Sequence, residues 1–147
     1  DMMTPAYGQS ELVKKLCAEF QTTDTCAVHV RGGDIIGPGR AFFERALARM
    51  EKERPGLRYL VFTNDREAAK EALEGEHTER KMTYISELGA FSDVDEFFLM
   101  AACRHQIISN SSYSTWAAYL NPNPEKVVIM PEYKGCEQIR LKEWIVL

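Results

Sequence analysis

The sequence contains few cysteines, and none of them has the spacing of a metal site or a redox pair. Cys17, Cys26, Cys103 and Cys136 are scattered over 147 residues without a C-x-x-C pair. We therefore expect reduced thiols, and neither a zinc site nor a disulfide framework. Long apolar runs are also absent, since no stretch approaches the roughly 18 residues that cross a bilayer.

Positive charge is equally limited, with 18 Lys and Arg against 22 Asp and Glu and a formal net charge of −4. This balance excludes an extended basic surface for nucleic acid or an anionic membrane, so an anionic ligand needs a local site. The glycines form no nucleotide-binding fingerprint. The segment Gly37-Pro38-Gly39 lacks the third glycine of G-x-G-x-x-G, and no G-x-x-x-x-G-K-[ST] is present.

What is present is the ordinary pattern of one globular domain, with 45% hydrophobic and 27% charged residues. Short apolar runs bounded by Gly, Pro, Asn or Asp predict buried strands at Cys26–Val30, Tyr59–Thr63, Gln106–Ser109 and Val127–Met130. A further short strand is expected at Lys81–Ile85. Helical patterns separate or precede them at Glu11–Phe20, Arg40–Lys52, Arg66–Glu74, Asp95–Cys103 and Ser112–Leu120.

Strands that are continuously apolar and alternate with helices are typical of a parallel sheet covered on both faces. We therefore expect a doubly wound, mainly parallel α/β domain of Rossmann-like type over residues 1–147. On its first helix, Leu12, Leu16 and Phe20 should form the buried side. Trp116 and Tyr119 are expected in the core.

Ligands of such folds bind outside the carboxyl ends of the strands, where His29 and Arg31 follow one another on the same face of the first strand. An arginine followed by two glycines suits a phosphate, which a guanidinium grips in bidentate fashion. The alternative is an ion pair between Arg31 and Asp34 across a tight turn. The residues alone leave both interpretations open.

A second candidate follows the strand at Gln106–Ser109, where Ser111, Ser112 and Tyr113 open a helix. A helix N-terminus presents free N–H groups and a positive dipole end to an anion. Simple N-capping by a serine explains the same residues equally well.

The pair Asp93 and Asp95 has the D-x-D spacing that can hold a divalent metal, but Ser92 and Asp95 are also spaced like a capping box. A carboxylate here could instead accept hydrogen bonds from the paired donors of guanine. His105, at a junction between helix and strand, is expected to be structural.

Several of these segments together resemble the α-1,2-fucosyltransferase family, and its bacterial branch in particular. They are VHVRGGD, LVFTND, the block DEFFLMAACRHQIISNSSYSTWAAYLNPNPEKVVIMP and LKEWI, in order from about residue 26 to the end. The resemblance implies a GT-B enzyme that transfers L-fucose from GDP-fucose to a galactose hydroxyl of an acceptor glycan. Transfer would invert the anomeric centre and need no cofactor and no metal.

The resemblance also implies roles for individual residues of a GDP-fucose site. Arg31 matches the phosphate-binding arginine, with His29 beside it, and would stabilise charge on the departing GDP. Asp95 matches a guanine-binding carboxylate, and Ser111 and Ser112, with Tyr113 next to them, match donors near the pyrophosphate. Asp34 is a candidate catalytic base by position only.

Three positions depart from the family pattern: Gly32 replaces a second arginine, Asn64 an aspartate and Thr115 a tryptophan. The missing cation at Gly32 is expected to weaken stabilisation of the leaving GDP. A GT-B enzyme also needs a second domain of similar size. We therefore expect residues 1–147 to be the C-terminal, donor-binding half, whose cleft is completed by an N-terminal domain or a second subunit. The alternative is a non-catalytic nucleotide or nucleotide-sugar binding domain. The bacterial branch implies a cytoplasmic location, with an anchor upstream of residue 1 left open.

Overall fold

The computed structural model describes residues 10–31, 38–73, 81–133, 136–138, 140–141 and 143–147. Its helices are α1 (Glu11–Thr22), α2 (Arg40–Glu53), α3 (Arg66–Leu73), α4 (Asp93–Ala102) and α5 (Ser112–Leu120), with short 3-10 turns at Ile85–Glu87 and Cys136–Gln138. Its strands are β1 (Thr25–Val30), β2 (Arg58–Thr63), β3 (Lys81–Tyr84), β4 (His105–Ile107), β5 (Val128–Met130) and β6 (Ile145–Val146). The predicted alternation of strands and helices is confirmed.

The six strands form one sheet in the order β3-β2-β1-β4-β5-β6, and every neighbouring pair is parallel. The chain first builds outward from β1 to β3 and then returns to place β4 on the other side of β1. The order therefore reverses between β1 and β4, which is the topological switch point where ligands of doubly wound sheets bind. The predicted fold class is confirmed.

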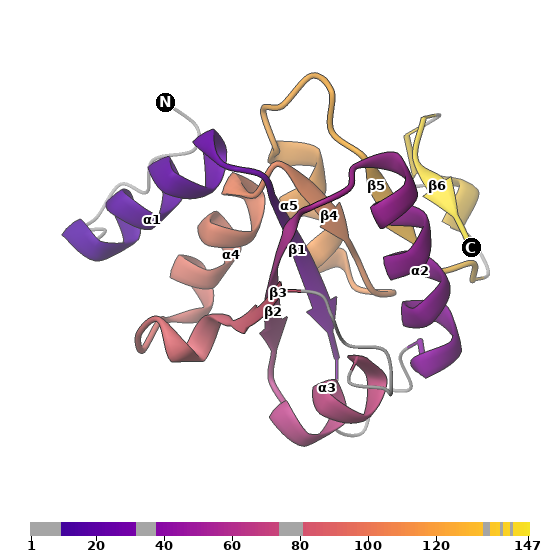
Figure 1. Cartoon of the computed structure of the whole chain (residues 1–147), viewed down its shortest axis with the longest axis horizontal. Coiled ribbons are helices and arrows are strands. Elements are labelled where there is room, and N and C mark those ends of the chain that lie inside the picture. The colour runs from indigo at the N-terminus through magenta and orange to yellow at the C-terminus, as the bar shows by residue number, and fades with distance from the viewer. Residues whose placement is uncertain (1–9, 32–37, 74–80, 134–135, 139, 142) are drawn as a thin grey trace.

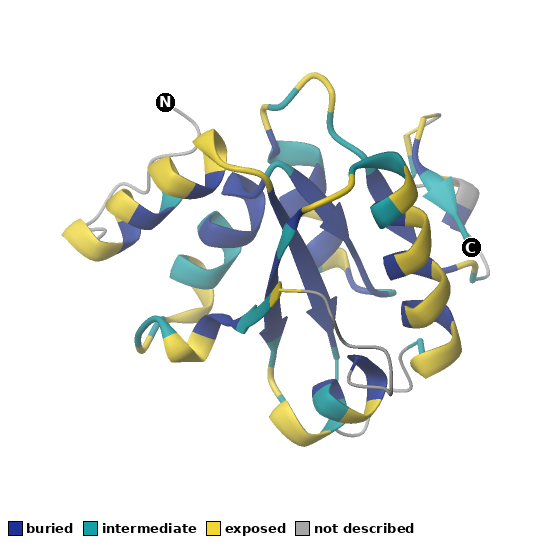
Figure 2. Ribbon diagram, in the orientation of Figure 1, coloured by how far each residue is buried: buried dark blue, intermediate teal, exposed yellow. Residues whose placement is uncertain are grey.

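Helices cover both faces of the sheet, with α1 and α4 on one side and α2 on the other (Figure 1). Alternation along β1 explains this arrangement. Val28 packs into a core with Phe43 and Leu47 of α2, while Ala27 faces the opposite core with Phe20 of α1 and helix α4. Strands β1, β4 and β5 are buried throughout, whereas the edge strands β3 and β6 are partly exposed. The outer sides of the helices and several loops are exposed (Figure 2). No described helix is long and apolar enough to span a membrane.

Two predictions about helix faces were wrong. The buried side of α1 consists of Val13, Leu16 and Phe20, whereas Leu12 is 44% exposed. Trp116 is 58% exposed on the outer side of α5, where its ring meets that of Tyr119 edge to face. In both helices an apolar residue lies next to the buried stripe, and sequence spacing alone does not show which neighbour faces the core.

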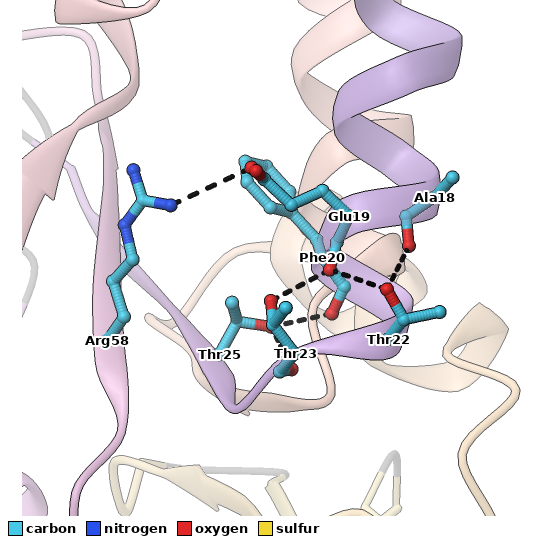
Figure 3. Close-up of polar contacts among 7 residues, drawn as sticks. All are labelled: Ala18, Glu19, Phe20, Thr22, Thr23, Thr25 and Arg58. Atoms are coloured by element: carbon cyan, nitrogen blue, oxygen red, sulfur yellow. Dashed lines mark hydrogen bonds and ion pairs between the residues drawn. The ribbon is translucent and has the colours of Figure 1, made fainter.

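The start of β1 is fixed by a threonine cluster at the end of α1 (Figure 3). The buried hydroxyl of Thr25 donates to the Phe20 carbonyl at 2.8 Å and accepts from the Arg104 N–H at 3.2 Å. Arg58 of β2 reaches Glu19 of α1 at 3.7 Å in the same region. These bonds join α1, β1, β2 and the residue before β4 at the amino end of the sheet.

Candidate functional site

A pocket of about 460 Å³ opens at the carboxyl ends of β1 and β2, bounded by the first turns of α4 and α5. This is the side of the switch point that doubly wound folds use for ligands. The residues that line it are His29, Arg31, Phe62, Thr63, Asn64, Asp93, Glu96, Ser111, Ser112 and Tyr113.

One wall of the pocket is positive. Arg31 follows β1 directly and is half-buried, and within the described parts of the chain its guanidinium forms no ion pair. Facing the same space is the N-terminus of α5, where Ser111 Oγ accepts from the Tyr113 N–H at 3.2 Å and so caps the helix. Ser112 is exposed at the first helical position. A guanidinium and a helix N-terminus together suit an anion.

A second, acidic wall of the same pocket carries carboxylates from the first turn of α4. Asp93 and Glu96 are three residues apart, so both lie on the same face of the helix, and both line the pocket. Burial, and secondarily the neighbouring Asp93, raise the pKa of Glu96. Acidic residues in the first turn of a helix also interact favourably with the positive end of the helix dipole, so the same groups have a structural role.

The rings of His29 and Tyr113 also line the pocket, with centroids 5.7 Å apart. The Tyr113 hydroxyl donates to the Asp93 carbonyl at 2.6 Å and thereby ties α5 to α4. His29 Nδ1 lies 2.8 Å from Ser109 Oγ, so a hydrogen bond crosses the switch point from β1 to the segment that follows β4. Burial, and secondarily Arg31, lower the pKa of His29 to about 4. The imidazole is therefore neutral at pH 7.

The structure brings together five of the predicted site residues: His29, Arg31, Ser111, Ser112 and Tyr113. It does not place Asp95 among the residues that line the pocket. Asp95 lies toward α1 instead, where burial and secondarily this carboxylate raise the pKa of Cys17 to about 11. Asp34 and Gly32 lie outside the described residues.

Sequence reasoning missed Glu96, and among the acidic residues of this segment it assigned the guanine-binding role to Asp95 rather than to Asp93. The missed signal is helical spacing, because a helix beginning at Asp93 places residues 93, 96 and 97 on one side and Asp95 on another. Ser92 Oγ caps this helix by accepting from the Asp95 N–H at 3.1 Å. Among the described residues, no three His, Cys, Asp or Glu side chains come together as metal ligands.

His105 has the structural role expected of it. Its Nδ1 accepts from the Val127 N–H at 2.9 Å and so joins β4 to the residue before β5. Burial, and then the nearby Arg54 and Arg104, lower its pKa to about 4. No disulfide joins the cysteines of the described residues, as expected, and Cys26 and Cys103 are buried.

The fold and pocket define a doubly wound α/β domain with a polar ligand site at its switch point. Comparison with known proteins identifies its kind: residues 10–147 match glycosyl transferase family 11, and the chain belongs to this family. It is 28% identical over 151 residues to the O-antigen biosynthesis glycosyltransferase WbnK of Escherichia coli. That match covers 89% of this chain and 48% of WbnK, so the chain spans about half the length of that relative. The family expected from the sequence motifs is confirmed.

Proposed function

We propose that this chain is the donor-binding half of a GT-B enzyme that transfers L-fucose from GDP-fucose to a galactoside hydroxyl, with α-1,2 linkage and inversion. The other half, either an N-terminal domain or a second subunit, would complete the cleft and carry much of the acceptor site. The proposal rests on membership of glycosyl transferase family 11 and on the polarity of the pocket.

The observation that carries the proposal is the meeting of a positive wall and an acidic wall in one pocket. Arg31 and the start of α5 suit a diphosphate, whereas Asp93 and Glu96 suit the paired N1–H and N2–H₂ donors of guanine. A pocket of about 460 Å³ also has the size of a small-molecule site. We therefore propose that guanine binds at the acidic wall formed by α4. Glu96, rather than Asp95, would be the main hydrogen-bond acceptor for the guanine.

In this mechanism the acceptor hydroxyl attacks the anomeric carbon as the bond to the β-phosphate oxygen breaks. Negative charge grows on that phosphate, and Arg31 and the N–H groups of α5 are placed to stabilise it without a metal. Asp34 stays a prediction for the general base.

A second candidate is a non-catalytic nucleotide-sugar binding domain, favoured by Gly32, which stands where the family has a second arginine. Replacing Gly32 by Arg in the full-length protein separates the two. For an enzyme, the added cation should raise the transfer rate more than the donor affinity, because its charge is needed as GDP departs. A binding domain should show no transfer in either form.

The direct test is turnover of GDP-fucose by the full-length protein with a galactoside acceptor, measured with Mg²⁺ and with EDTA. The proposal predicts release of GDP and an α-1,2-fucosylated product under both conditions. Transfer of a different sugar, or a strict requirement for Mg²⁺, would contradict it.

A further inference from the structure

We propose that Ser109 is a positioning residue that holds His29 in the tautomer with its proton on Nε2, so that the ring offers an N–H donor to an oxygen of the bound nucleotide. The donation to a nucleotide oxygen rests on the proposed function, whereas the assignment of the tautomer does not. Ser109 lies two residues after β4 and His29 near the end of β1, and these two strands flank the switch point.

The direction of this hydrogen bond follows from the surroundings of Ser109. Its side chain is fully buried, and His29 Nδ1, at 2.8 Å, is the only partner of its hydroxyl among the described residues. If Nδ1 carried the proton, Ser109 Oγ would accept it and its own O–H would have no acceptor. A buried donor without an acceptor loses its hydrogen bonds to water and gains none in return, which is unfavourable. Ser109 therefore donates, Nδ1 accepts, and the proton of the neutral ring lies on Nε2.

The position of Ser109 is itself fixed from both sides. Its own N–H donates to Ser114 Oγ at 3.3 Å, and the preceding residue Ile108 donates its N–H to the Ile129 carbonyl of β5 at 2.9 Å. The Ser109 hydroxyl is thus held in place at the carboxyl end of the sheet before any ligand binds. Such pre-organisation is what a donor in a binding pocket requires.

The other groups around His29 do not supply this control. The Tyr113 hydroxyl is committed to the Asp93 carbonyl at 2.6 Å. Arg31 is a cation near the ring, and a cation disfavours protonation and attracts a nitrogen lone pair. Without Ser109, the ring is free to turn its lone pair toward the pocket, where it would repel the oxygens of a phosphate or ribose.

The primary test is nitrogen-15 NMR of the His29 ring in the nucleotide-free chain at pH 7.5. The proposal predicts one tautomer, with Nε2 protonated and Nδ1 bare. Ser109→Ala should give a mixture with more protonated Nδ1, and Ser109→Thr, which keeps the hydroxyl, should restore the parent spectrum. A parent protein with its proton on Nδ1, or an unchanged tautomer in Ser109→Ala, would overturn the assignment.

Ser114→Ala is the matched control, because it removes another fully buried serine hydroxyl that contacts Ser109 but not His29. Because Ser109 keeps its hydroxyl in this variant, and Ile108 still bonds to β5, the His29 tautomer should change far less than in Ser109→Ala. GDP affinity should fall about three- to tenfold in Ser109→Ala, the range of a neutral hydrogen bond, and by less in Ser109→Thr. If no variant binds GDP but the tautomers behave as described, the proposed function fails and the positioning role stands. Equal GDP affinity in parent and Ser109→Ala would remove the link between the tautomer and the nucleotide.

Discussion

If Glu96 is the main acceptor for guanine, as proposed, Glu96→Gln should remove the expected preference for GDP over ADP. Glu96 is half-buried on the acidic wall of the pocket, and a carboxylate there can accept both N1–H and N2–H₂ of guanine. Glutamine has the same size but offers one acceptor and an NH₂ group that would oppose the guanine donors. A hydrogen bond to a charged group contributes about 1.5–3 kcal/mol. GDP affinity should therefore fall roughly ten- to more than a hundredfold, with ADP affinity almost unchanged.

Asp95→Asn is the matched control for this measurement. It removes one negative charge from the same first turn of α4, so it has a similar effect on the helix dipole. Because Asp95 lies toward α1, both nucleotides should bind to it as they bind to the parent. Calorimetric titration of GDP and of ADP into both variants measures the two affinities, and their ratio shows which carboxylate is responsible for the preference. If Asp95→Asn loses the preference for GDP and Glu96→Gln keeps it, the assignment of the acidic wall is wrong.

Three further outcomes are expected. Burial lowers the pKa of His29 and of His105 to about 4. The stability that comes from keeping these two histidines neutral is therefore complete above the ordinary histidine pKa of about 6.5, and it is lost as the pH falls toward 4. The free energy of unfolding in urea should therefore fall by about 2 kcal/mol per histidine between pH 7.5 and pH 5, and His105→Asn should show a smaller fall; an equal fall in that variant would contradict this origin. Phe43→Ala, at a fully buried position of α2, should reduce the free energy of unfolding by about 3–5 kcal/mol. Leu12→Ala should change it by about 0.5 kcal/mol or less, and a larger loss would show that Leu12 packs in the core.

The sequence patterns predicted the central strands because each is a short, continuous apolar run between turn residues. Two-residue strand β6 carries no such signal, since its pairing with β5 depends on the rest of the sheet. The positive wall of the pocket was predictable from chain order alone, because Arg31 and Ser111 each follow a strand. The acidic wall was not, because one residue along a helix turns the side chain by about 100°. The choice between Asp95 and Glu96 depends on how α4 packs between α1 and α5.

The central claim is that the pocket at the switch point binds the diphosphate of GDP through Arg31. Calorimetric titration of GDP into the parent chain, Arg31→Ala and Arg31→Lys tests it most directly. Loss of a charge-assisted hydrogen bond should weaken GDP binding by about 1.5–3 kcal/mol in Arg31→Ala, roughly ten- to more than a hundredfold. Lysine should restore only part of the affinity, because an ammonium group lacks the planar fork of a guanidinium. Equal GDP affinity in the parent and in Arg31→Ala would contradict the account.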